Sequence, residues 1–367
     1  MRISAIIKTL EDFANPMYQE DWDNTGVQVG NTASECTGVL VCLDVTPAIV
    51  DEAIAKKCNL IISHHPLFFR PVKRLTGATL QEATAINAIA AGITIYSSHT
   101  AADSTPGGVS YEMARLLGVN PLRVLSPLAD RLILLQAIVP VTHVQEVEAA
   151  LFDAGAGQLG NYDCCSFTTK GEGKFRALDG ATPFVGEPGK QHTEDEVMIS
   201  VVLTRDIRGE VERALLDTHP YETPAYYFTP LLNTMREVGL GVYGVMDNAM
   251  SQDDFINKVK EAFGCTAVRT TKMPNDPDRK IRRVAMCGGA GAEFISRAIA
   301  MGAQAYVTAD LKYHDFVDYR DRILVIDAGH FDTEAPIKQA MARLIKEWWS
   351  ETPVYCTDTE DNPINYK

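Results

Sequence analysis

Four of the eight histidines in this 367-residue chain occur in three short segments. Each segment contains either a second histidine or an acidic residue in addition to its histidine. Two histidines are adjacent and are followed by proline, and each of the other two has a carboxylate four positions further along. The residues concerned are His64, His65, His99, Asp103, His330 and Glu334. Imidazole and carboxylate groups together are donors that divalent transition metals bind in proteins. The pattern predicts a metal site if the fold brings the three segments together.

Four imidazoles and two carboxylates exceed the four donors of one tetrahedral ion. They suit two divalent ions about 3.5–4 Å apart, bridged by a carboxylate and a water. Zinc fits this donor set, and so do manganese, iron, cobalt and nickel. We therefore expect two divalent metal ions per chain as cofactors. The alternative is a set of unrelated surface histidines, with Asp103 as a cap for the helix predicted over Val109–Leu117.

The neighbouring elements predict how these segments are positioned. Leu60–Ile62 is continuously apolar, which predicts a short buried strand, and Pro66 favours an extended or turn conformation for the residue before it. Ile93–Ser97 and Ile323–Asp327 predict two further strands, each ending just before a histidine segment. Strands that alternate with helices predict a largely parallel sheet, whose carboxyl ends lie on one rim. We expect the three segments to meet at such a rim.

The middle of the chain, over 128–232, has a different order of elements. The predicted elements, together with a glycine-rich stretch over Gly155–Gly189, follow the order β-α-β-β-α-β, which is ferredoxin-like. The chain is therefore expected to have an α/β lobe over 1–127, an inserted α+β domain over 128–232 and a second α/β lobe over 233–367. A further loop is predicted over Asn275–Asp278.

Composition narrows the class of protein. The net charge of −14 argues against nucleic acid or an anionic membrane as a partner, because both require clustered cations. Met1–Phe13 has the pattern of an amphipathic helix rather than a signal peptide, and no apolar stretch reaches transmembrane length. We expect a cytoplasmic protein. The adjacent Cys164 and Cys165 are interpreted as structural, with redox activity as the alternative.

Two further segments carry candidate chemistry. Gly288–Gly291 follows a predicted strand and can present backbone N–H groups to a phosphate, but the spacing lacks a full nucleotide-binding motif and favours a tight turn between strand and helix. Lys312 and His314 follow the next predicted strand, Ala305–Thr308. His314 is a candidate general acid or base because its pKa lies near physiological pH, and Lys312 is a candidate for substrate contact.

Four motifs in this order resemble the Nif-three-like family, whose bacterial members are often labelled GTP cyclohydrolase I type 2. They are Trp22-Asp23-Asn24-Thr25-Gly26, Ser63-His64-His65-Pro66, His99-Thr100-x-x-Asp103 and Gly329-His330-Phe331-x-Thr333-Glu334. The resemblance implies a dinuclear metal site on the six residues above, in a toroidal homohexamer. Thr308–His314 resembles a further family segment, with Ala309 where glycine is usual. The inserted domain resembles the PII/CutA-like domain of longer members.

Two functions follow from these expectations. The first is a metal-dependent hydrolase acting on a nucleotide such as GTP; the family label implies opening of the imidazole ring of GTP by metal-activated water. The second is a non-catalytic metal-binding or regulatory protein, in which the inserted domain responds to a small effector. The motifs fit metal-hydroxide chemistry but contain no signature for recognition of a nucleotide base.

Overall fold

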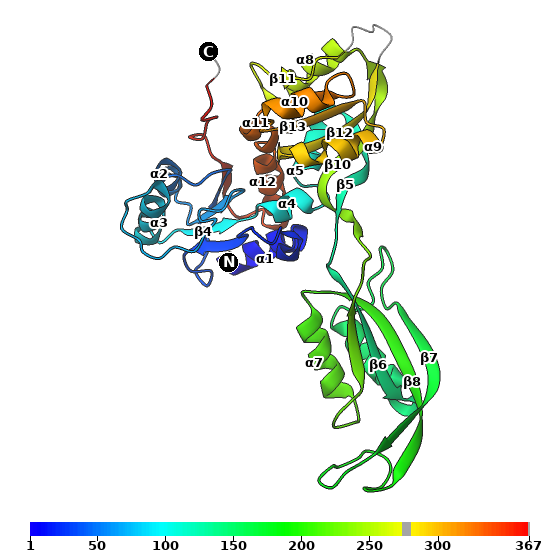
Figure 1. Cartoon of the computed structure of the whole chain (residues 1–367). Helices are drawn as coiled ribbons and strands as arrows, with labels where there is room; N and C mark the ends of the chain where they lie inside the picture. The colour runs from blue at the N-terminus through cyan, green and yellow to red at the C-terminus, as the bar shows by residue number, and fades with distance from the viewer. Residues whose placement is uncertain (274–279, 366–367) are drawn as a thin grey trace. The chain divides into compact units, whose positions relative to one another are not determined.

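The computed structural model describes residues 1–273 and 280–365, so the loop predicted over Asn275–Asp278 lies outside the described residues. The chain divides into two compact units (Figure 1). The split unit comprises Met1–Leu128 and Arg236–Lys367, and the inserted unit comprises Ala129–Met235. No helix among the described residues is long and apolar enough to cross a membrane.

The first sheet of the split unit has five strands in the order β1-β4-β3-β2-β15, all parallel except β1. These strands are β1 (Gly26–Val29), β2 (Val39–Cys42), β3 (Leu60–Ser63), β4 (Thr94–Ser97) and β15 (Val354–Cys356). Helices α2 (Pro47–Ala55) and α3 (Leu80–Ala90) pack against one face. Helices α1 (Ile3–Phe13) and α12 (Ile337–Trp348) pack against the other. The central strands are buried on both faces, which explains their continuously apolar sequence.

The second sheet has six strands in the order β11-β14-β13-β12-β10-β5. These strands are β5 (Val119–Leu128), β10 (Met235–Met250), β11 (Arg269–Thr270), β12 (Ile281–Ala290), β13 (Ala305–Ala309) and β14 (Leu324–Asp327). Strands β12, β13 and β14 are parallel, whereas β10 and β11 run antiparallel to their neighbours. Helices α5 (Val109–Leu117) and α8 (Gln252–Phe263) cover one face, and α9 (Ile295–Ala300) and α10 (Tyr313–Tyr319) cover the other.

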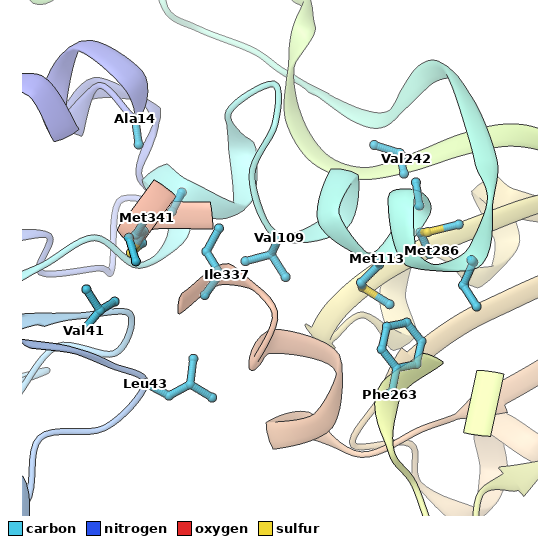
Figure 2. Packing of buried hydrophobic residues seen from close by; sticks show 14 of the residues in the cluster. Ala14, Val41, Leu43, Val109, Met113, Val242, Phe263, Met286, Ile337 and Met341 are labelled. Atoms are coloured by element: carbon cyan, nitrogen blue, oxygen red, sulfur yellow. The ribbon is translucent and has the colours of Figure 1, made fainter. Parts of the chain in front are cut away.

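One hydrophobic core joins the two sheets. It runs from Val41 in the first sheet through Ile337 and Met341 of α12 to Met113 of α5 and Met286 in the second sheet (Figure 2). The α12 side chains in this core recur every four residues, as expected for one apolar face of a helix. Burying each such side chain contributes about 1.5–3 kcal/mol. The split unit is therefore a single packed body.

This arrangement corrects two sequence-based expectations. The histidine segments do not follow strands of one sheet, because β3 and β4 belong to the first sheet and β14 to the second. The sheets also exchange strands between the predicted lobes: β5, from 1–127, joins the second sheet, and β15, from 233–367, pairs with β2. Element order along the chain does not specify these long crossovers.

The inserted unit has the ferredoxin-like order of elements. These are β6 (Leu132–Pro140), α6 (Val144–Asp153), β7 (Ser166–Arg176), β8 (Gln191–Thr204), α7 (Arg208–Thr218) and β9 (Tyr226–Pro230). Its sheet is antiparallel in the order β7-β8-β6-β9, and both helices pack on one face. The stretch Gly155–Gly189, expected only to be glycine-rich, contains the whole of β7. That strand is at the sheet edge and almost entirely exposed, so it lacks an apolar pattern.

Candidate metal centre

The six predicted ligands lie where strands from both sheets end. His64 and His65 follow β3, and His99 follows β4 directly before the short helix α4 (Thr100–Ser104), which carries Asp103. His330 and Glu334 begin and end α11 (His330–Glu334), which follows β14. Asp103 is not the cap of α5, because that helix has Gly108 at its N-cap. The structure therefore brings all three segments together, with donors from each.

Glu334 lies at the middle of the cluster. Its Oε2 atom is 2.9 Å from Nε2 of His65, 3.0 Å from Nε2 of His330 and 3.9 Å from Nε2 of His64. Oδ1 of Asp103 lies 3.6 Å from Nε2 of His64. Three overlapping groups of donors can each hold a metal ion: His64 with His65 and His99; His65 with His330 and Glu334; and His64 with Asp103 and Glu334.

Each imidazole is held from its outer side through Nδ1. Nδ1 of His64 bonds the backbone carbonyl of Ser98 at 3.0 Å. The other three bond carboxylates: His65 to Asp44 at 3.0 Å, His99 to Asp23 at 2.9 Å and His330 to Asp310 at 2.6 Å. Such partners orient each ring so that Nε2 faces the cluster, where a metal can bind it.

The three outer aspartates were not singled out as functional residues from the sequence. Asp23 lies in the Trp22–Gly26 motif, Asp44 follows β2, and Asp310 follows β13, so their positions at strand ends were the available signal. Asp310 also has a left-handed backbone, with φ of 56°, which is uncommon outside glycine. Strain of this kind occurs at functional sites, where the surrounding structure holds it in place.

Two buried atoms in the cluster have no hydrogen-bond partner among the described residues. They are Nε2 of His64 and Oδ1 of Asp103. Burial lowers the pKa of His64 to about 3, so its ring is neutral, and burial raises the pKa of Asp103. Buried polar atoms are normally paired, because an unpaired one loses its bonds to water. Both unpaired atoms, a neutral imidazole nitrogen and a carboxyl oxygen, can bind a cation. A cation between them would supply the partner that each atom lacks.

Three other donors, His65, His330 and Glu334, are held in charged forms. Burial alone would lower the pKa of His65, but its bonds to Asp44 and Glu334 outweigh burial and raise that pKa to about 10. The bond to Glu334 raises the pKa of His330 to about 9. Burial would raise the pKa of Glu334, yet its bonds to His330 and His65 hold that pKa below its ordinary range. Protons thus occupy positions that a metal must take over, so binding releases protons.

The glycine-rich segment combines the end of a strand with the expected turn between strand and helix. Gly288–Ala290 is the end of strand β12, and Gly291 is the single residue before a 3-10 helix over Ala292–Phe294. The N–H of Gly289 donates to Oγ1 of Thr333 rather than pointing at a ligand. Gly289 has φ of 62°, and a Cβ atom there would lie 2.2 Å from Oε1 of Glu334. Glycine at this position makes room for the central carboxylate of the cluster.

The cluster opens on a cavity of about 600 Å³, within the size range of small-molecule sites. Five of the six predicted ligands line it, and the sixth, His64, is fully buried behind them. Trp22 and Phe69 also line the cavity, and their rings lie 5.6 Å and 5.7 Å from the ring of His99, in edge-on orientation. Metal donors and aromatic side chains thus share one opening.

Lys312 and His314, the predicted catalytic residues, are placed elsewhere. Both are exposed at the beginning of α10, and neither is among the described residues that line this cavity. Neither residue belongs to any of the three donor groups. Their predicted role in acid–base chemistry remains a prediction.

A mixed α/β fold with a histidine–carboxylate cluster able to hold metal defines the class of this protein. The family model for Duf34/NIF3 (NGG1p interacting factor 3) matches residues 1–363, and the chain belongs to this family. The expected family and fold class are thereby confirmed.

Individual relatives agree with this assignment. The chain is 34% identical over 367 residues to a protein of Halalkalibacterium halodurans named GTP cyclohydrolase 1 type 2 homolog, covering 98% of each chain. It is also 34% identical to a Bacillus subtilis protein of the same name, covering 98% of this chain and 97% of that one. A crystal structure of a Bacillus cereus protein related to NIF3 superposes with a TM-score of 0.82 at 32% identity, covering 100% and 99% of the two chains.

Proposed function

We propose that this protein is a metal-dependent hydrolase that acts on a nucleotide such as GTP. The observation that carries the proposal is the pair of unpartnered buried atoms, Nε2 of His64 and Oδ1 of Asp103, inside a donor cluster that opens on a cavity. The name shared by the two relatives, GTP cyclohydrolase 1 type 2 homolog, supports the reaction class.

Two divalent cations are proposed for the cluster because its donors form overlapping groups rather than one closed set. The proposed ligands are His64, His65, His99, Asp103, His330 and Glu334, with zinc, manganese, iron, cobalt or nickel as the ion. When bound, two such ions bring the pKa of a water close to neutrality and polarise the bond under attack. The outer bonds of the histidines through Nδ1 keep their Nε2 atoms directed at this position.

Aromatic and basic side chains support a nucleotide as substrate. Trp22 and Phe69 are large apolar side chains that are 61% and 50% exposed at the cavity, where they are able to stack on a planar base. Phe69 also borders an adjoining cavity of about 730 Å³, which is lined by Arg70, Lys73 and Arg74. None of these three cations forms an ion pair with a described residue, and they suit the phosphates of a nucleotide in an otherwise acidic chain.

Lys312 and His314 are proposed as acid–base groups on the sequence argument alone. If one of them transfers a proton, its substitution by alanine should lower kcat by about 10²–10⁴-fold at unchanged metal content. Unchanged kcat in both variants would assign proton transfer to other groups. We also propose that the chain forms a homohexamer, as the family resemblance implies; light scattering of the purified protein tests this.

The decisive experiment measures turnover of GTP by protein reconstituted with each metal in turn. Loss of absorbance from the intact purine and chromatographic detection of the ring-opened product report the reaction. We expect activity with at least one metal, loss of activity in His64→Ala, and retention in His143→Ala, which removes a half-buried histidine of the inserted unit. Absence of turnover by fully metal-loaded protein would contradict the hydrolase proposal.

That negative result would favour the second candidate, a non-catalytic metal-binding or regulatory protein. The specific observation in its favour is a separate cavity of about 530 Å³ in the inserted unit, remote in sequence from the metal donors. A regulatory protein would need such a place for an effector.

A further inference from the structure

The cavity of the inserted unit lies on the sheet face opposite its two helices. Alternate residues of β6 and β8 pack into the helix-covered core, and Ile138 and Met198, from the intervening positions, line the cavity instead. The connection between β7 and β8 forms another wall, where the Glu222 carboxylate accepts hydrogen bonds from the N–H of Thr182 at 3.1 and 3.2 Å. The volume of about 530 Å³ suits a small organic molecule.

Three aromatic side chains line this cavity. The ring centroid of Tyr221 lies 5.9 Å from that of Phe175 and 6.2 Å from that of Phe184. Phe175 comes from the end of β7, Phe184 from the connection and Tyr221 from the segment after α7. Aromatic faces carry partial negative charge and attract organic cations, most strongly where water is excluded.

A buried carboxylate faces the same cavity. Glu196 is only 6% exposed, and its Oε2 lies so close to Gly173 that a Cβ atom there would be 1.6 Å away. No lysine or arginine among the described residues forms an ion pair with Glu196. A buried carboxylate without a cation is unfavourable, because it has lost water without gaining a partner of opposite charge.

The neighbouring His219 does not supply that charge. Its Nε2 donates to the carbonyl of Ile138 at 2.9 Å, and its Nδ1 accepts from the N–H of Tyr221 at 3.0 Å. The bond accepted at Nδ1 requires the neutral imidazole, because a protonated ring has no acceptor. Burial lowers the pKa of His219, which keeps the ring in that form.

The other charged side chains that line the cavity cancel one another, so Glu196 determines its net charge. Lys170 and Lys174 are offset by Glu172 and Glu222. Deeper in the cavity, the Tyr221 hydroxyl is buried beside Glu196 and has no hydrogen bond of normal geometry with a described residue. It is a polar group in position to accept from an N–H donor.

We propose that this cavity binds a small organic ammonium ion with an apolar body. Its charged group pairs with Glu196 and donates to the hydroxyl of Tyr221, while its apolar part contacts Phe175 and Phe184. An anion would be repelled by Glu196, and a neutral ligand would leave that carboxylate unpaired. This site is separate from the metal centre and does not depend on the proposed hydrolase activity.

Isothermal titration calorimetry of the full chain tests the charge requirement directly. The probe is 2-phenylethylammonium, compared with 2-phenylethanol, which has the same shape without the charge, and with phenylacetate. We expect the ammonium ion to bind at least about tenfold more tightly than the alcohol, and phenylacetate to give no binding heat. Equal affinity for the ammonium ion and the alcohol, or no binding of the ammonium ion at millimolar concentration, would overturn the proposal.

Variants locate the site. Glu196→Gln should abolish the preference for the ammonium ion, and Tyr221→Phe should weaken its binding several-fold. Glu194→Gln is the matched control, because it removes the same charge two residues away on the same strand and outside the cavity lining. Unchanged preference in Glu196→Gln would refute the assignment. If circular dichroism shows that this variant does not fold, Phe184→Ala replaces it, and binding unaffected by that change would also refute the proposed site.

Discussion

Nε2 of His64 and Oδ1 of Asp103 lie 3.6 Å apart in a buried position, and neither has a hydrogen-bond partner among the described residues. The distance is too long for a direct hydrogen bond. The two donors are thus arranged around a common space rather than bonded to each other. Loss of such bonds costs about 1–3 kcal/mol for each neutral group. A cation in that space would remove this cost.

We therefore predict two divalent ions per chain. Elemental analysis of protein purified in the presence of zinc, manganese, iron and cobalt should approach this stoichiometry. Glu334→Gln should lose at least one ion, because Glu334 belongs to two of the three donor groups. Glu293→Gln is the control, since Glu293 lines the same cavity without belonging to any group. A content of zero in wild-type protein, or full content in Glu334→Gln, would refute the prediction.

Asp310→Asn should weaken metal binding without removing a ligand. Asp310 holds Nδ1 of His330, and loss of such an outer partner typically costs about 10–100-fold in metal affinity. Competition with a chromophoric chelator measures the affinity. Asp12→Asn, which breaks an exposed pair with Lys8, should leave it unchanged. An affinity equal to wild type in Asp310→Asn would show that His330 is held in place by other contacts.

Gly289→Ala should disturb both stability and metal binding. The added Cβ would lie 2.2 Å from Oε1 of Glu334 and would displace that carboxylate. Gly264→Ala provides a matched control: its φ of 71° resembles the 62° of Gly289, but a Cβ there meets no atom within 4 Å. Both variants carry a backbone cost of about 1–2 kcal/mol, measured by urea unfolding. Only Gly289→Ala should also lose metal; equal metal content in the two would contradict the proposed collision.

Local sequence patterns predicted much of the fold. Helix α5 has the predicted bounds, Val109–Leu117, because a complete apolar face and flanking glycines define it. The six cluster residues could be predicted as a set because each follows a strand, and strand ends are specified by short apolar runs. The sequence did not reveal that two sheets contribute, because strand pairing such as that of β15 with β2 joins segments more than 300 residues apart. The outer aspartates lie much closer in sequence to the histidines they hold, but each lies beside a different strand from its histidine, so only the strand pairing reveals the contact.

Excision of 128–232 should leave the metal centre intact. The two segments of the split unit lie next to each other where the insert joins them. A Cβ on Gly239 of β10 would lie 2.0 Å from the carbonyl oxygen of Ser126 in β5. A short glycine–serine linker should therefore close the gap. The inserted unit has its own core of strand and helix side chains and should fold separately. Loss of metal or aggregation of the excised protein would show that the two units depend on each other.

Acid should destabilise the inserted unit through His219. Burial lowers the pKa of this residue, with a smaller contribution from His143, while the bond to Ile138 and the charge of Glu196 oppose the shift. The unfolded chain, with a His pKa of about 6.5, then binds the proton more readily than the folded chain does. The stability that the neutral ring provides is therefore fully present above about pH 6.5, the pKa of the unfolded state. It is lost as the pH falls below about 6.5.

Hydrogen exchange of the β6 and β8 amides at pH 7.5 and pH 5.5, corrected for intrinsic rates, measures this effect. Protection should fall at the lower pH in wild-type protein and much less in His219→Gln, because glutamine can keep a donor and an acceptor without titrating. His143→Gln is the control, since His143 is half-buried, bonds to Thr142 and makes only the smallest of the contributions to the pKa shift of His219. Its protection should fall as in wild type. An equal fall in all three proteins would show that another group causes the acid sensitivity, because the buried ring of His219 would then contribute nothing to it.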